Sequence, residues 1–126
     1  MLVVDSSAWI EWLTDGPLTS KLSGLFPARD QWIVPTIVQH ELTKWLLRER
    51  GEEAADEFLA FTLKCVVSPV DTGIAVDAAN ICRAHKLATA DAIIYATALA
   101  HNAGLLTCDA HFDGLVGVTF VAKAGQ

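Results

Sequence analysis

The stretch Thr89-Ala90-Asp91-Ala92-Ile93-Ile94-Tyr95-Ala96-Thr97-Ala98-Leu99-Ala100 sets the strongest constraint on how this chain folds. Read as an α-helix, it is apolar on nearly every face, and such a helix is buried at the centre of a protein. Asp91 stands in its first turn, where Thr89 is placed to cap the helix and the helix dipole favours an acid. An ionised carboxylate in a core is costly unless something pairs with it. Asp91 therefore either completes the start of the helix or faces a cation.

On both sides of this stretch, short apolar runs alternate with amphipathic helices. Runs typical of buried strands cover residues 2–4, 32–34, 65–67, 105–108 and 118–121. Helices are expected at residues 6–13, 18–25, 35–50, 52–63 and 71–85, with Ser6 and Ser7 as N-caps of the first, Gly51 ending the third and Leu59 facing inward from the fourth. Strands and helices of this length in alternation predict an α/β fold with a parallel sheet covered on both faces.

The bulk composition limits the class of protein. A chain of 126 residues fits a single domain. Hydrophobic residues make up 52% of it, yet its apolar runs fall short of the ~20 residues that a membrane span requires. The first five residues contain no Lys or Arg and end on an acid, unlike a signal peptide. We expect a cytoplasmic protein, without membrane contact, whose apolar excess serves its core and a subunit interface.

Cysteine number and net charge restrict the chemistry less tightly. The 3 cysteines are scattered without a Cys-x-x-Cys pair, which argues against a disulfide framework and a zinc site. A net charge of −6 disfavours binding of nucleic acid through bulk positive field. If four of the 15 acids share a metal pocket, however, 11 acids face 9 bases and the remainder is −2. Net charge therefore does not exclude a nucleic-acid substrate.

Acidic residues follow two of the expected strands. Asp5 comes directly after the first strand and Asp109 after the fourth, while Asp91 begins a helix. The carboxyl ends of parallel strands share one edge of the sheet, and ligands bind there at a switch in strand order. Glu41 lies about two turns into its helix, on the apolar stripe, with a side chain long enough to lean toward that edge. We expect these four acids to meet in one cleft.

Each acid also has a structural explanation to be weighed. Asp5 can cap the first helix, Asp91 can complement a helix dipole and Asp109 can form a turn. Glu41 has no comparable structural task in the middle of an apolar helix stripe. Four carboxylates in contact repel one another by ~4 kcal/mol per pair at about 4 Å, at an effective dielectric near 20, unless protons or a metal compensate them. All-oxygen ligation favours Mg²⁺ or Mn²⁺ over zinc, and such an ion suits phosphodiester hydrolysis.

Four motifs in order carry a resemblance to a known family. They are Val3-Val4-Asp5-Ser6-Ser7-Ala8-Trp9-Ile10-Glu11, the segment 35–42 that contains Glu41, Ala90-Asp91-Ala92, and Leu106-Thr107-Cys108-Asp109-Ala110-His111-Phe112. With their spacing, which extends over essentially the whole chain, they resemble the PIN-domain family, and within it the VapC-type toxins of toxin–antitoxin pairs. The resemblance implies a three-layer α/β/α sandwich with a mostly parallel central sheet, formed as a single PIN-like domain over residues 1–126.

The resemblance also implies an activity and a set of site residues. The activity is that of an Mg²⁺- or Mn²⁺-dependent endoribonuclease that cleaves single-stranded or loop RNA. Asp5, Glu41, Asp91 and Asp109 would be its catalytic and metal-binding acids, and Asp113 falls where many members carry a further acid. Ser6 and Thr107 match small hydroxyl residues that would orient a carboxylate or a water. His111, two residues after Asp109, is more typical of a surface residue and is left out of this set.

Partners follow from the same resemblance. It implies a cognate antitoxin protein whose tail blocks the acidic pocket, and an RNA substrate of the tRNA or rRNA class. The apolar excess fits a homodimer. Lys44, Arg48 and Arg50 form either a solvated helix face or the local contacts to an RNA backbone, and the four tryptophans are expected as core or interface anchors.

Two other classes of protein remain to be weighed. One is a catalytically silent PIN-like module that acts only through protein contacts, and loss of effect on substitution of Asp91 separates it from the nuclease. The other is a phosphoacceptor receiver domain, which also places Asp at strand ends. A receiver domain carries adjacent acids after its first strand, and Asp5-Ser6-Ser7 does not supply them.

Overall fold

The computed structural model describes residues 1–122 and contains a five-stranded sheet in which every pair of neighbours is parallel. The strands are β1 (Leu2–Val4), β2 (Trp32–Pro35), β3 (Val66–Ser68), β4 (Gly104–Thr107) and β5 (Val118–Phe120), in the order β3-β2-β1-β4-β5. The predicted parallel α/β fold is therefore confirmed, and each predicted strand lies within one residue of the observed bounds.

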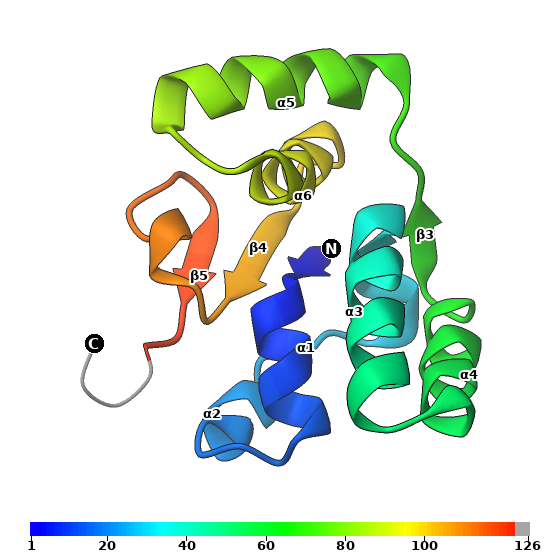
Figure 1. Cartoon of the computed structure of the whole chain (residues 1–126). Helices are drawn as coiled ribbons and strands as arrows, with labels where there is room; N and C mark the ends of the chain where they lie inside the picture. The colour runs from blue at the N-terminus through cyan, green and yellow to red at the C-terminus, as the bar shows by residue number, and fades with distance from the viewer. Residues whose placement is uncertain (123–126) are drawn as a thin grey trace.

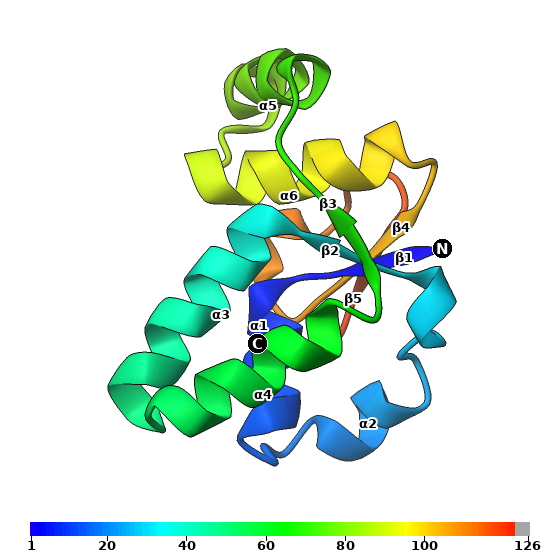
Figure 2. The same cartoon turned by 90° about the vertical axis from the view of Figure 1, so that its right-hand side faces the viewer.

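Helices cover both faces of this sheet and complete three layers. They are α1 (Ser6–Leu13), α2 (Thr19–Ser23), α3 (Thr36–Glu49), α4 (Glu52–Thr62), α5 (Thr72–His85) and α6 (Thr89–Ala100), with short 3-10 helices at Arg29–Gln31 (η1) and Ala110–Phe112 (η2). Figure 1 gives their arrangement, and Figure 2 shows α5 and α6 on one side of the sheet with α1, α2 and α4 on the other. The α/β/α sandwich is thus confirmed.

The helix α6 is the central element of its layer. It packs on β1, β2 and β4, while α5 packs against its outer side. Its buried side chains, which include Ile94, Tyr95 and Ala98, therefore face the sheet and α5 at the same time. A helix enclosed on two sides has no wide polar face, which explains its nearly uniform apolar sequence.

The direction of α6 places its first turn at the edge of the sheet where the parallel strands end. The helix ends at Ala100, close in sequence to Gly104 where β4 begins, so it runs antiparallel to the strands. Its 12 residues span ~18 Å. Its N-terminus therefore lies at the edge where the strands end, and Asp91 is in its first turn.

The strand order reverses between β1 and β4. The chain moves outward from β1 through β2 to β3, crosses back to β4 and then continues outward to β5. Loops leaving β1 and β4 must diverge, which opens a crevice between their carboxyl ends. The register fixes what meets there, because Val4 pairs with Leu106 and the Asp5 N–H donates to the Leu106 carbonyl at 2.9 Å.

Two helix starts differ from the prediction. Asp5, and not Ser6 or Ser7, occupies the N-cap position of α1, and Ala88, not Thr89, occupies that of α6. Neither residue caps its helix through a side-chain capping hydrogen bond. The two serines are the first helical residues of α1, and their hydroxyls donate to carboxylates instead. Local capping statistics failed here because Ser6 donates to Glu41 of α3, and Ser7 Oγ accepts from the Cys108 N–H after β4.

The prediction for α4 was wrong at one position. Ala55 and Phe58 are buried as expected, but Leu59 is 40% exposed. One residue corresponds to ~100° around a helix, so a stripe centred on Phe58 turns Leu59 to its margin. The predicted C-cap of α3 was also displaced by one residue: Arg50 is the C-cap, and Gly51 follows it as the N-cap of α4, with a φ of 97° that suits glycine.

Under α1 lies an aromatic cluster that forms much of the core on that face. Trp9 is its centre, only 1% exposed, with ring centroids 4.8 Å from Trp32 and 5.0 Å from Phe58. The remaining members are Trp12, Phe26 and Phe61.

In the described part of the chain, no helix is both long and apolar enough to cross a membrane.

Replacing Trp9 with alanine tests this core. We expect Trp9→Ala to lower the free energy of unfolding by ~3–5 kcal/mol, because it removes a large buried ring and leaves a cavity. Urea denaturation measures the loss. Leu63→Ala is the control, since Leu63 is 64% exposed and its truncation should change stability by less than ~0.5 kcal/mol. Similar losses for both variants would contradict the assignment of Trp9 as the core anchor.

Candidate active site

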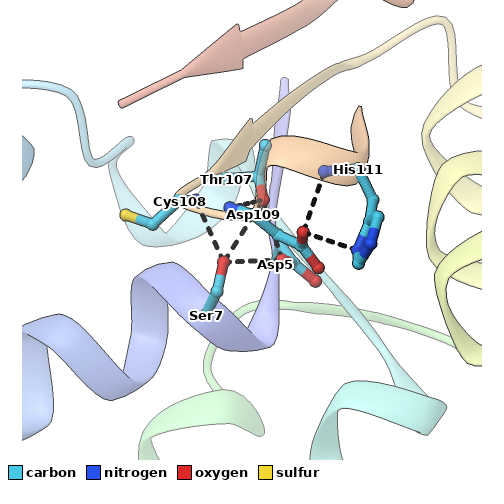
Figure 3. Close-up of polar contacts among 6 residues, drawn as sticks. All are labelled: Asp5, Ser7, Thr107, Cys108, Asp109 and His111. Carbon is cyan, nitrogen blue, oxygen red and sulfur yellow. Dashed lines mark hydrogen bonds and ion pairs between the residues drawn. The ribbon is translucent and has the colours of Figure 1, made fainter. Parts of the chain in front are cut away.

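Asp5 is a buried acid held by two hydroxyl groups. It is 3% exposed, and its Oδ2 accepts hydrogen bonds from Ser7 Oγ at 2.7 Å and from Thr107 Oγ1 at 2.8 Å (Figure 3). Each hydroxyl has a single proton to donate. The 3.2 Å approach of Ser7 Oγ to Thr107 Oγ1 therefore reflects two donors converging on one carboxylate oxygen.

Backbone N–H groups at the end of β4 set the direction of these hydroxyls. The Cys108 N–H donates to Ser7 Oγ at 3.0 Å, and the Asp109 N–H donates to Thr107 Oγ1 at 2.9 Å (Figure 3). Each hydroxyl oxygen thus accepts from the backbone and donates to Asp5. The end of β4 in this way fixes the carboxylate that follows β1.

Asp109 follows the same strand and is held by the next turn. Its Oδ1 accepts from the His111 N–H at 2.9 Å, and Nδ1 of the His111 ring also lies 2.9 Å from Oδ1. This second contact is a hydrogen bond when Nδ1 carries the proton. The 3-10 helix η2 produces both contacts, because it folds His111 back over Asp109, the residue that precedes the helix (Figure 3).

Glu41 and Asp91 complete the acidic group. Ser6 Oγ donates to Glu41 Oε1 at 2.8 Å, which joins the first residue of α1 to α3. Asp91, at the start of α6, is close enough to Asp5, Asp109 and Glu41 for the negative charges of all three to act on it. The structure thus brings together all four acids that the sequence singled out, at the switch between β1 and β4.

Three of these carboxylates share one arrangement. One oxygen each of Asp5, Asp109 and Glu41 accepts a side-chain or turn hydrogen bond, at Oδ2, Oδ1 and Oε1 respectively. Among residues 1–122, no side-chain donor reaches the second oxygen of any of the three within hydrogen-bond distance. The Asp5 carboxylate also accepts a hydrogen bond from the Ser6 backbone N–H. For Asp109 and Glu41, the protein orients the carboxylate by one atom and leaves the other atom for a ligand.

Charge repulsion and burial disturb the titration of two acids. Burial, followed by the charges of Asp5, Asp109 and Glu41, raises the pKa of Asp91 from 3.8 to about 6, and His111 acts against this shift. Burial also raises the pKa of Asp5, with a contribution from Asp109, against the lowering effect of its hydrogen bonds from Ser7 and Thr107. Both shifts mark carboxylates that are buried first of all, and that lie close to other negative charges.

Ser6 and Thr107 contact carboxylates, as the sequence suggested, but other assignments differ. Asp113 is exposed at the end of η2, and no hydrogen bond or ion pair within residues 1–122 joins it to the four acids. Ser7 was assigned only a capping role, and its contact with Asp5 became visible only from the β1–β4 pairing. His111 was left out, although its ligand atom lies within 4.8 Å of those of Asp91 and Asp109. The Asp-x-His spacing of Asp109 and His111 was the sequence signal that could have placed His111 in the site.

The donor chemistry of the site fits a divalent cation. Asp91, Asp109 and His111 offer ligand atoms within 4.8 Å of one another, and Asp5 and Glu41 add carboxylates beside them. Carboxylate oxygens are ligands for hard ions such as Mg²⁺ and Mn²⁺. A cation would also stabilise the charged forms of Asp5 and Asp91, whose pKa values burial and neighbouring negative charges raise.

Solved structures with the same fold come from toxin–antitoxin systems. The chain is similar to a protein in a toxin–antitoxin complex from Klebsiella pneumoniae, with a TM-score of 0.81 and 20% identity over 94% of this chain and 96% of that one. It is similar to VapC20 of Mycobacterium tuberculosis, described as a sarcin–ricin loop cleaving toxin, with a TM-score of 0.74 and 20% identity over 98% and 100% of the two chains. A chain of a DNA-bound VapBC complex from Salmonella typhimurium gives a TM-score of 0.71 and 15% identity over 96% of each chain.

At these identities the likeness concerns the fold alone. Among curated protein sequences, none matches the chain. The family model described as PIN domain, however, matches residues 2–117, and this match includes Asp5, Glu41, Asp91 and Asp109. The chain therefore belongs to the PIN-domain family.

Proposed function

We propose that this protein is a metal-dependent endoribonuclease that hydrolyses phosphodiester bonds in single-stranded or loop RNA. One observation carries the proposal: four carboxylates converge at the sheet switch point, and hydrogen bonds from hydroxyl groups or from a turn hold three of them in place. A crowded acidic group destabilises a fold unless protons or a metal ion compensate its charge. Acids with perturbed pKa values are accordingly typical of functional sites. Membership of the PIN family, and the RNA cleavage named for the similar VapC20, favour RNA as the substrate.

Asp91 and Asp109 are the proposed principal ligands of Mg²⁺ or Mn²⁺, with Asp5 and Glu41 beside them and Asp113 as a more distant acid. When bound, such an ion supplies Lewis-acid activation of water and offsets charge on the reacting phosphate. Oxygen donors outnumber the single imidazole of His111, which favours these hard ions over zinc.

The chain's own residues perform the positioning. Ser7 and Thr107 hold Asp5 from α1 and β4 together, so the two strands at the switch point cannot separate without releasing the carboxylate. Ser6 holds Glu41, and His111 holds Asp109. These contacts keep like-charged groups at fixed positions before the substrate arrives, as a preorganised site requires.

We further propose that the ribonuclease is the toxin of a toxin–antitoxin pair and forms a homodimer. The similar structures include VapBC complexes, in which toxin and antitoxin are bound together. Exposed apolar side chains at Val70, Val76 and Leu99 offer surface for protein contacts. A silent protein-interaction module would explain these surfaces but not the ordered carboxylates, so the nuclease is the favoured function.

Replacing Asp91 tests the catalytic proposal. We expect wild-type protein to cleave tRNA or rRNA fragments in Mg²⁺ or Mn²⁺ and to lose this activity in EDTA. Asp91→Asn should lower the rate by about 10²-fold or more, because it removes a charged ligand atom while keeping the size of the side chain. Gel analysis of labelled RNA measures both rates.

Asp77→Asn is the matched control, since Asp77 is exposed on α5. It should cleave at the wild-type rate. Full activity of Asp91→Asn, or cleavage by wild type that persists in EDTA, would sink the proposal.

The crowded acids also predict how stability depends on pH. With its pKa raised from 3.8 to about 6, folded Asp91 keeps a proton that the unfolded chain has already released between those values. Stability without metal should therefore fall as the pH rises through this interval. We expect Asp91→Asn to melt at a higher temperature than wild type at pH 7 in EDTA, and this advantage should shrink toward pH 4. An advantage of equal size at both pH values, or an opposite sign, would contradict the raised pKa of Asp91.

Thr107→Val tests the support of Asp5. The substitution conserves shape but removes the hydroxyl that donates to Asp5 Oδ2 and accepts from the Asp109 N–H. Loss of such a supporting contact typically costs about 10–100-fold in metal affinity or activity. We expect a weaker apparent affinity for Mn²⁺, measured by titration calorimetry, and rescue by Thr107→Ser. Unchanged metal affinity in Thr107→Val would show that Thr107 does not position the site.

A further inference from the structure

A groove of about 470 Å³ leads away from the acidic group along α3. Ser6 and Glu41 line the end of the groove that belongs to the site, and Lys44 and Arg48 line it further along the helix. The acidic site is therefore continuous with a surface of opposite charge.

The two cations stand on one side of α3. Lys44 and Arg48 are four residues apart, which places them on the same face with a rise of ~6 Å between them. Both also border a second hollow, of about 670 Å³, on the outer face of α3, so their side chains can be reached from solvent. Arg48 forms an ion pair with Glu49, but both side chains are largely exposed, at 64% and 48%, and such pairs hold weakly. Within residues 1–122, Lys44 has no ion pair.

The same groove contains the one tryptophan outside the aromatic cluster. Trp9, Trp12 and Trp32 pack together under α1, whereas Trp45 makes no aromatic ring contact within residues 1–122. It is half-buried on α3 and lines the groove opposite Ile10 of α1. Trp45 packs against the hydrophobic core, as expected, and it also lines the groove, which puts its indole beside two cations at the mouth of an acidic site.

We infer that this α3 groove binds the RNA strand next to the scissile bond, with Lys44 and Arg48 on backbone phosphates and Trp45 stacked on a base. The inference rests on the proposed ribonuclease function and adds where the substrate lies. A positively charged track combined with aromatic stacking is the usual surface for single-stranded nucleic acid. Glu41 and Arg48 are ~10 Å apart along the helix, so the two cations lie within a few nucleotides of the acidic site.

Charge complementarity favours RNA over a protein segment as the occupant. The chain has a net charge of −6, and its acidic site repels a polyanion. An RNA strand that reaches the site therefore needs cations close by, and the groove supplies two within ~10 Å of Glu41. An apolar protein segment would gain from Ile10 and Ile37 but would have no use for the cations.

The test compares RNA binding by wild type and by Lys44→Ala/Arg48→Ala. Fluorescence anisotropy with a labelled single-stranded RNA, in EDTA to prevent cleavage, gives Kd between about 50 and 200 mM KCl. We expect the double variant to bind about tenfold more weakly, and the slope of log K against log salt to fall by about 1.4, because each lost phosphate contact contributes about 0.7.

Lys21→Ala/Lys64→Ala is the control, because it removes the same charge from exposed residues of α2 and of the α4–β3 connection. Its salt slope should equal that of wild type. Trp45→Leu should bind about tenfold more weakly and Trp45→Phe less so, since phenylalanine keeps a ring for stacking. Circular dichroism verifies that the Trp45 variants are folded.

Cleavage separates failure of the inference from failure of the proposed function. If wild type cleaves RNA in Mg²⁺ but the salt slope of Lys44→Ala/Arg48→Ala is unchanged, the groove is not the RNA track and the nuclease stands. If that variant keeps RNA binding but loses binding to a co-expressed antitoxin, the groove belongs to a protein segment and the inference is overturned. If wild type neither binds nor cleaves RNA, both proposals fail.

Discussion

Repulsion among four carboxylates at the β1–β4 switch point is the constraint on which the rest of the structure depends. Asp5, Glu41, Asp91 and Asp109 come from four different elements, and each would relax away from the others if its element could move. The fold resists this in two ways. A buried sheet and the enclosed helix α6 fix the backbone, and hydroxyl groups fix the carboxylates. The raised pKa values of Asp5 and Asp91 reflect what this placement costs, through burial first and through the neighbouring charges second.

The apolar character of α6 allows the helix to be enclosed on two sides, and this enclosure fixes its position. A helix with one apolar stripe could rotate or shift with little loss, but α6 is enclosed by the sheet on one side and by α5 on the other. Because well-packed interiors leave no room for small displacements, the first turn of α6 has a fixed position. Asp91 has no hydrogen bond from another described side chain, so packing alone must place it.

The fold and the four acids could be predicted because their signals are local in the sequence. Apolar runs, helix periodicity and acids at strand ends all lie within a few residues of one another. The role of Ser7 could not be predicted, since it depends on contacts with Thr107 and Cys108, about one hundred positions away, whereas the family resemblance already assigned Thr107 to orienting a carboxylate or a water. Capping statistics misassigned Ser6 and Ser7 for the same reason, and His111 required the turn of η2 to become a neighbour of Asp109. Register and turn geometry therefore decide what short-range patterns leave open.

The acidic site and the cationic groove answer two different electrostatic needs of one substrate. A polyanion approaching four carboxylates is repelled unless positive charge is present on both sides of the reacting phosphate. A divalent cation would supply it at the centre, and Lys44 and Arg48 are placed to supply it along the strand. Neither alone is sufficient, because a protein with a net charge of −6 has no long-range attraction for RNA. Selectivity would then arise over the few nucleotides that contact α3, where the chain combines charge with the indole of Trp45.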